Sequence, residues 1–117
     1  MSGKLDQLAA LARMVKDAEI LRFGRAVSER RDIENARRSL QEARRNVQRS
    51  STPDAAHLSG QAALWQIWAG QQLRDLNAGL AMAAAREETA RTAAARAAGR
   101  ADVLARLARR QDQKPRG

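Results

Sequence analysis

The sequence predicts an all-α fold, an antiparallel two-helix coiled-coil hairpin with a C-terminal helical overhang. Apolar residues recur every three or four positions in both halves of the chain, as on one face of a helix. One break, Ser50-Ser51-Thr52-Pro53-Asp54, separates the halves, and proline suits the first position of a helix but not its interior. Only 3% of the 117 residues are aromatic, which disfavours strands.

The first arm is expected over about residues 4–49. Its first apolar run is Leu8, Leu11, Val15 and Ala18, and a second run extends from Ala26 to Val47. The two runs do not share one register, because the steps from Ala18 through Arg22 to Ala26 resemble a coiled-coil stutter. Gly24 weakens a helix by about 1 kcal/mol relative to Ala. We therefore expect one continuous helix with a soft point at Arg22–Gly24.

The turn is expected at about 50–52, and the second arm over about 53–110. Thr52 can cap the new helix, and Asp54 places negative charge at its positive end. The spacing between successive apolar positions of this arm's seam alternates between three and four residues without interruption, as in a heptad repeat. Its members are Leu73, Leu76, Leu80, Ala83, Glu87, Ala90, Ala94, Ala97, Ala101, Leu104 and Ala108. The polar tail 111–117 is expected to fray, so that 1–117 form a single hairpin.

Folding the arms about this turn makes the numbers of facing residues sum to roughly 103. Leu40 then faces Ala63, and Leu8 faces Ala95. Large side chains of the first arm meet small ones of the second, which suits close packing. Because the first arm runs out near residue 4, the second arm is expected to overhang from about Arg100 onward.

Nothing in the sequence predicts an enzyme. We expect no catalytic residues, no cofactor-binding residues and no metal ligands, since His57 is the one histidine and cysteine is absent. No glycine-rich phosphate loop follows a strand. No signal peptide and no run of eighteen apolar residues is visible, so the expected location is cytoplasmic.

The formal net charge of +9 is compatible with nucleic acid, an anionic membrane or an acidic protein as partner. Residues 1–49 carry 12 basic and 7 acidic groups, and residues 50–117 carry 10 and 6. The charge is therefore evenly spread along the chain, and a generic excess of Arg is an equally good interpretation.

The first candidate partner-binding site is the expected overhang. Its residues are Arg100, Val103, Leu104, Arg106 and Leu107. An apolar stripe between arginines can lie on a membrane or enter an acidic protein cavity. The alternatives are that this end frays or pairs in a dimer.

The second candidate is a cluster of large apolar side chains, Leu64, Trp65 and Trp68. A two-helix seam buries only one side of such a cluster, and tryptophan is enriched at interface hot spots. In one alternative, both rings lie flat along the first arm over Asn35 and Arg38. In another, two hairpins bury this face as a homodimeric four-helix bundle.

A basic coiled coil that binds nucleic acid is a further alternative. Arg37-Arg38 and Arg44-Arg45 lie one heptad apart and could straddle phosphates. No aromatic stacking residues accompany them, and acidic residues interleave.

The segments Glu29–Ala43 and Ala97–Leu107, together with the hairpin pattern and the basic Arg/Glu/Gln-rich arms, resemble the FliJ/YscO family of flagellar and type III export stalk proteins. The resemblance covers the whole chain, which is shorter than typical members. It implies a non-enzymatic cytoplasmic protein at the periphery of the inner membrane. Its partners would be a hexameric export ATPase, which takes up the two chain ends, and an export-gate membrane protein, contacted through the second arm near Trp65 and Trp68.

Overall fold

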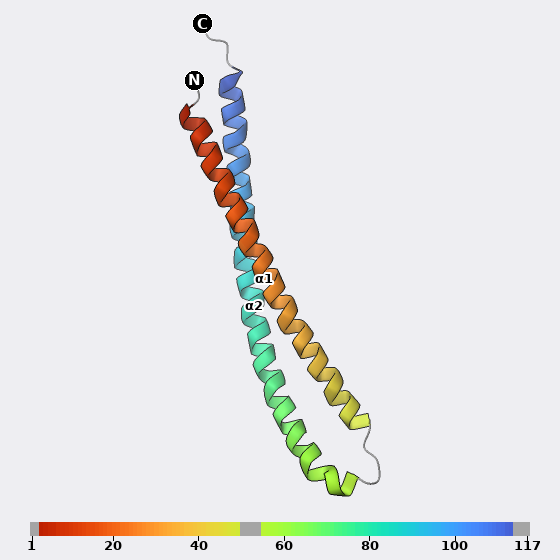
Figure 1. The fold of residues 1–117 in the computed structure, drawn as a ribbon. Coiled ribbons are helices and arrows are strands. Elements are labelled where there is room, and N and C mark those ends of the chain that lie inside the picture. The colour runs from red at the N-terminus through yellow and green to blue at the C-terminus, as the bar shows by residue number, and fades with distance from the viewer. Residues whose placement is uncertain (1–2, 50–54, 114–117) are drawn as a thin grey trace. The chain divides into compact units, whose positions relative to one another are not determined.

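The computed structural model describes residues 3–49 and 55–113. They form two α-helices, α1 (Gly3–Arg49) and α2 (Ala55–Asp112), and the described residues contain no strand. The two helices run antiparallel (Figure 1), which confirms the all-α hairpin. α1 continues without interruption through Gly24, and α2 ends two residues beyond the expected Arg110. The expected turn and the capping residues Thr52 and Asp54 lie outside the described residues.

The chain divides into two compact units, each made of one stretch of α1 and one stretch of α2. The terminal unit comprises Met1–Val27 and Arg86–Gly117, and the middle unit comprises Ser28–Ala85. Each unit packs α1 against α2 through its own seam. The expected single domain therefore has its helix-to-helix contacts grouped in two places.

The seam expected for α2 is confirmed by the burial of its members. Every seam residue from Leu73 to Ala108 is buried or half-buried. The buried members are Ala83, Glu87, Ala90, Ala94, Ala97, Ala101 and Ala108. Alanine has the highest helix propensity and adds no bulk at the contact, so this side of α2 allows another helix to approach closely.

The seam expected for the start of α1 is wrong. Leu8, Leu11, Val15 and Ala18 are exposed, and the neighbouring side of the helix packs against α2 instead. Ala10, Val27, Glu34, Gln41 and Ala43 are half-buried beside the contact. The residues that form its continuous row, all of them buried or half-buried, are Leu5, Ala9, Ala12, Lys16, Glu19, Phe23, Ala26, Arg30, Ile33, Arg37, Leu40, Arg44 and Val47. Their steps alternate four and three throughout, so the expected stutter is absent. Long polar side chains can occupy such positions because their apolar stems cover alanine while their charged ends reach water.

The expected pairing register is also wrong. In the terminal unit, the Arg91 guanidinium lies 5.6 Å from the centre of the Phe23 ring, and these residue numbers sum to 114. In the middle unit, Arg44 Nε donates to Gln66 Oε1 at 2.8 Å, and these numbers sum to 110. Arg44 also lies over Gly70, since a Cβ on Gly70 would be 3.7 Å from Arg44 Nη2. The pairing is therefore offset from the expected one by 11 residues in the terminal unit and by 7 residues in the middle unit.

This offset corrects the expected overhang. Ala101 and Ala108 are 4% and 7% exposed, so α1 covers α2 almost to its end, and no overhang begins at Arg100. In the terminal unit, Gly3 falls opposite about Arg110, which leaves only the last residues of α2 unopposed. In the middle unit, Arg49 falls opposite about Gln61. The first residues of α2 are thus the longer unopposed stretch.

Candidate partner-binding surfaces

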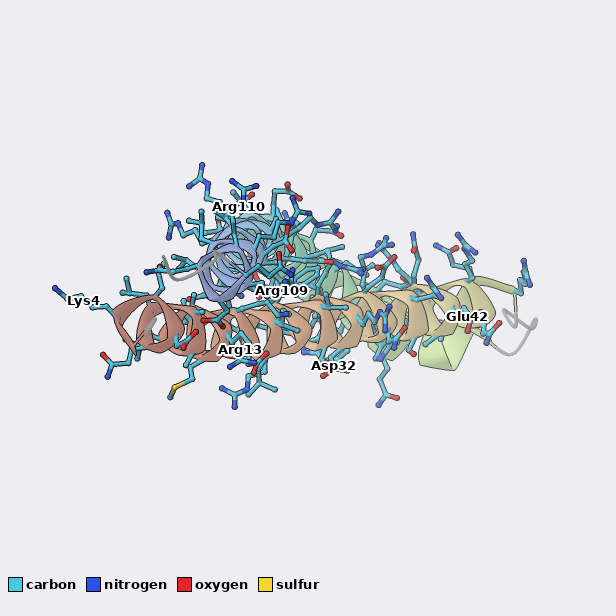
Figure 2. The ribbon with its side chains drawn as sticks, turned by 90° about the horizontal axis from the view of Figure 1, so that it is seen from above. Lys4, Arg13, Asp32, Glu42, Arg109 and Arg110 are labelled. Atoms are coloured by element: carbon cyan, nitrogen blue, oxygen red, sulfur yellow. The ribbon has the colours of Figure 1, made fainter. Side chains whose placement is uncertain are left out.

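The positive charge is concentrated in the terminal unit. This unit carries 14 of the 22 basic and 7 of the 13 acidic residues, which gives +7, and the middle unit carries the other 8 and 6, which gives +2. Lys4 of α1 and Arg110 of α2 project away from the ribbons (Figure 2). The even spread along the sequence therefore does not hold in the fold, because the fold brings together two basic segments that are far apart in the chain.

The terminal unit also carries most of the exposed large apolar side chains. They are Leu8, Leu11, Met14, Val15, Ile20, Leu21, Val103 and Leu107, with exposed fractions between 41% and 66%. The other four large exposed apolar residues, Leu64, Ile67, Trp68 and Met82, belong to the middle unit. Basic charge and exposed apolar surface thus coincide in the unit that holds both chain ends, a combination typical of surfaces that bind acidic or amphipathic partners.

The residues of the expected overhang divide between the seam and the surface. Leu104 is half-buried and points from α2 toward the ribbon of α1, whereas Val103 and Leu107 are 54% and 41% exposed. Arg106 is exposed and pairs with Asp102 at 3.0 Å. Of these residues, Val103 and Leu107 therefore expose the most apolar surface, whereas Leu104 also packs in the hairpin seam.

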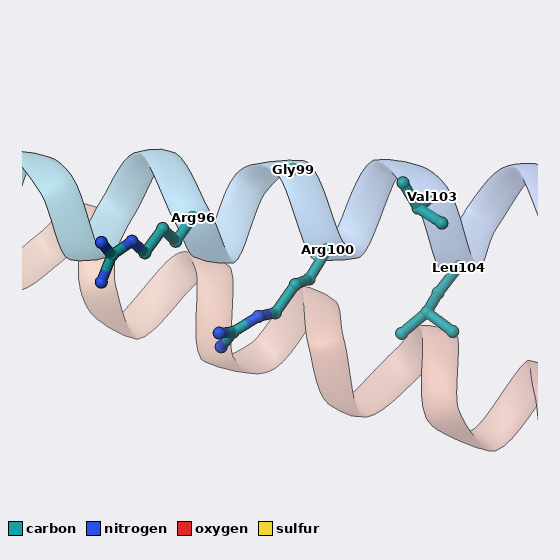
Figure 3. Close-up of a pocket in the computed structure, with 5 residues that line it drawn as sticks. All are labelled: Arg96, Gly99, Arg100, Val103 and Leu104. Carbon is teal, nitrogen blue, oxygen red and sulfur yellow. The ribbon is translucent and has the colours of Figure 1, made fainter.

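A shallow groove of about 400 Å³ runs along α2 beside these residues. It is lined by Arg96, Gly99, Arg100, Val103 and Leu104 (Figure 3). Gly99 adds no side chain to its floor, and the arginines extend along its edge. Apolar floor and cationic edge together suit an apolar side chain that is followed by an acidic group.

The Trp cluster lies in the middle unit, close to where α1 ends. The Trp65 and Trp68 rings are 6.4 Å apart between centroids and are tilted by 42°. Trp68 and Leu64 are 49% and 68% exposed, while Trp65 is half-buried. The cluster therefore keeps one aromatic ring in the packed part of α2 and presents the other at the surface, an arrangement typical of partner-binding sites.

The arginine pairs considered for nucleic acid are partly used in packing. Arg37 and Arg44 belong to the α1 seam and are half-buried, and Arg44 is hydrogen-bonded to Gln66. Arg38 is exposed and lies 3.6 Å from Glu34. The middle unit that holds all four arginines has a net charge of only +2, so it provides little of the electrostatic attraction that phosphate binding needs.

Among the described residues, no group of three or more His, Cys, Asp or Glu side chains could hold a metal ion. None of the described helices is both long and apolar enough to cross a membrane. The side chain of His57 is outside the described set.

Sequence reasoning missed one surface. We define the α1 outer face as Leu8, Leu11, Met14, Val15, Ala18 and Leu21, all of them exposed. Part of this set had been assigned to the hairpin seam because it was the most apolar stripe of the helix. The signal that identifies the true seam is the unbroken alternation of four and three from Leu5 to Val47, which leaves the more apolar side free.

The chain matches no protein-family model, no curated protein and no solved structure.

Proposed function

We propose that the protein is a non-enzymatic coiled-coil stalk or adaptor of a flagellar or type III protein export apparatus. In this role the terminal unit enters a hexameric export ATPase, and the Trp cluster contacts the export-gate membrane protein. The proposal starts from the resemblance of Glu29–Ala43 and Ala97–Leu107 to the FliJ/YscO family. The observation that carries it furthest is the coincidence, in the unit that holds both chain ends, of a net charge of +7 and eight exposed large apolar side chains.

The charge and the exposed residues suit this role for a physical reason. A helical pair that sits within a ring needs surface that attracts the ring without locking it at one position. Arginines with long stems provide attraction over several ångströms, and scattered apolar side chains such as Val103 and Leu107 provide modest contact area. The groove beside Gly99 offers a place for an apolar side chain of the ring.

A pull-down against soluble extract of the source organism tests the proposal. The informative variant is Val103→Asp/Leu107→Asp, because both side chains are exposed and their change leaves the seam intact. Leu104 is a poorer choice, since it packs in the seam and its replacement would also destabilise the hairpin. The matched control is Leu64→Asp/Ile67→Asp in the middle unit, where both side chains are also exposed.

We expect the wild type and the control to recover an export ATPase, identified by mass spectrometry, and the Val103/Leu107 variant to recover at least tenfold less. Recovery of nucleic acid in place of the ATPase, released by salt and unchanged in either variant, would reject the stalk and favour a nucleic-acid-binding coiled coil. An ATPase that is lost only in the control would place the ring contact in the middle unit and contradict the assignment of the terminal unit.

A further inference from the structure

The two flanks of the terminal unit differ in charge. The seam rows give every residue a heptad position, with Ala9 of α1 and Ala94 of α2 both at position a. Because the helices run antiparallel, positions c and g of both helices lie on one side of the pair, and positions b and e lie on the other. We define the cg flank as Lys4, Leu8, Leu11, Val15, Ala18, Arg22 and Arg25 of α1 with Arg86, Thr89, Ala93, Arg96, Arg100, Val103, Leu107 and Arg110 of α2.

The cg flank carries seven basic residues and no acidic residue, so its charge is +7. The opposite flank, at positions b and e, carries three basic and five acidic residues, so its charge is −2. The other two acidic residues of the unit, Glu19 and Glu87, lie in the seam. The acidic residues of the opposite flank are Asp6, Asp17, Glu88, Asp102 and Asp112. The positive charge of the terminal unit is therefore directed to one side.

The cg flank also exposes five large apolar side chains. Leu8, Leu11, Val15, Val103 and Leu107 are between 41% and 57% exposed. Of the exposed large apolar residues of this unit, the opposite flank carries only Ile20.

Basic residues bound this apolar surface along both helices. On α1, the apolar positions lie between Lys4 and the pair Arg22 and Arg25, a stretch of about 30 Å at 1.5 Å per residue. On α2, Val103 and Leu107 lie between Arg100 and Arg110. No acidic side chain interrupts the flank, so an occupant would meet cations around apolar groups.

An anionic bilayer surface is complementary to this combination. Apolar side chains can enter the boundary between headgroups and acyl chains, while the long stems of Lys and Arg let their charged ends reach lipid phosphates. A nucleic acid would use the cations but would leave the five apolar side chains without an apolar partner. The helices present convex surfaces here, and the groove beside Gly99 is shallow, so the flank offers lipids, which adapt to it, more contact than a folded protein.

We propose that the cg flank binds the surface of membranes that contain anionic phospholipid, with both helices of the terminal unit lying along the bilayer. Binding is peripheral and reversible, since five partly exposed apolar side chains insert only shallowly. Salt weakens it by screening the cations but does not abolish it, because the apolar part remains. The inference does not depend on the export role, and a terminal unit held within an ATPase ring would not bind lipid at the same time.

Co-sedimentation of the full chain with vesicles tests the charge of the flank. Vesicles of phosphatidylcholine alone are compared with vesicles that also contain phosphatidylglycerol, and we expect binding only to the second kind. Arg96→Glu/Arg100→Glu should weaken this binding by at least about tenfold. The matched control, Arg13→Glu/Arg109→Glu, makes the same change in net charge at exposed positions of the opposite flank and should weaken it by no more than about twofold.

The apolar part of the flank has its own matched pair. Leu11→Ser should weaken vesicle binding several-fold, whereas Ile20→Ser, at a similarly exposed position of the opposite flank, should leave it unchanged. Since the chain has no cysteine, Leu11→Cys and Ile20→Cys can each carry one environment-sensitive dye. On vesicles with phosphatidylglycerol, the dye should shift to the blue at position 11 but not at position 20. Circular dichroism checks that every variant keeps its helix content.

The inference fails if the chain does not bind vesicles with phosphatidylglycerol at low salt. It also fails if the two charge variants lose binding equally, because net charge and not the flank would then decide. A dye at position 11 that stays in water on bound vesicles would show that the apolar side chains do not insert. A chain that ignores vesicles but binds duplex DNA through Arg96 and Arg100 would assign the flank to nucleic acid instead.

Discussion

Arg44 of α1 donates a hydrogen bond from its Nε to Oε1 of Gln66 on α2 at 2.8 Å, and its guanidinium also lies over Gly70. One arginine in the seam therefore joins the two helices of the middle unit. Ala69, beside Gly70, has no exposed surface.

Truncation of this pair should show coupling between the two residues. Arg44→Ala and Gln66→Ala are each expected to lower the free energy of unfolding by about 1 kcal/mol, because each leaves a part-buried polar group without its partner. The double variant should cost less than the sum of the single variants by about 0.5–1 kcal/mol. Urea unfolding followed by circular dichroism measures this difference, and strict additivity would show that the hydrogen bond contributes nothing to stability.

Replacing Gly70 with alanine should stabilise the chain. A Cβ at this position would lie 3.7 Å from Arg44 Nη2, which is an ordinary van der Waals contact, and no glycine among the described residues has a positive φ. The gain is expected to be about 0.5–1 kcal/mol in the free energy of unfolding, the usual difference between Gly and Ala within a helix. Gly79→Ala is the matched control, because its Cβ would meet nothing within 4 Å. If Gly70→Ala lowered the free energy of unfolding while Gly79→Ala raised it, the Arg44 side chain would be unable to move away from the new Cβ.

Enlarging the alanine seam should destabilise the hairpin. Ala97→Leu inserts three carbons at a position that is 4% exposed, and overpacking of this kind costs about 1–3 kcal/mol. Ala95→Leu changes an exposed position two residues away and should leave the free energy of unfolding within about 0.5 kcal/mol. Thermal unfolding of the two variants side by side measures the difference. Equal melting temperatures would show that the seam near Ala97 is loose.

Of two ion pairs in the terminal unit, the longer one should contribute more to the free energy of unfolding than the shorter one. Arg91 lies 3.8 Å from Glu87, a seam residue 8% exposed, and its guanidinium also faces the Phe23 ring. Arg106 and Asp102 are closer, at 3.0 Å, but their side chains are 69% and 55% exposed. Arg91→Ala should lower the free energy of unfolding by about 1 kcal/mol. Arg106→Ala should cost at most about 0.5 kcal/mol, because solvent screens an exposed pair. Denaturant unfolding of each variant decides between them, and a larger cost at Arg106 would contradict this ranking.

The fold class and the α2 seam could be predicted from the sequence because both follow from periodicity alone. From Leu73 to Ala108 no other side of α2 carries a continuous apolar stripe, since the other sides are polar or carry scattered apolar residues. At the start of α1, two sides of the helix could have formed the seam, and the side with more apolar residues was the wrong one. Lys16 and Glu19 belong to the true seam although they are charged, and only the continuity of the repeat through Phe23 indicates this.

The register and the charged surface could not be predicted for a different reason. Heptads fit one another equally well after a shift of one repeat, so facing positions depend on how many residues the connection uses. An error of 7 to 11 residues in the register moved the expected unopposed stretch from the chain end to the start of α2. A comparison of the two arms does not reveal the concentration of charge, since the groups that add up lie at the same end of both arms, in Met1–Val27 and Arg86–Gly117.

The alanine seam has a consequence for how this protein can change over generations. In most cores, random substitution tends to remove atoms and leave cavities. Here almost every replacement of Ala83, Ala90, Ala94 or Ala97 adds atoms, because only glycine is smaller. The hairpin is therefore more vulnerable to crowding than to loss of bulk, and compensating changes should arise on α1, where a long side chain can be shortened to make room.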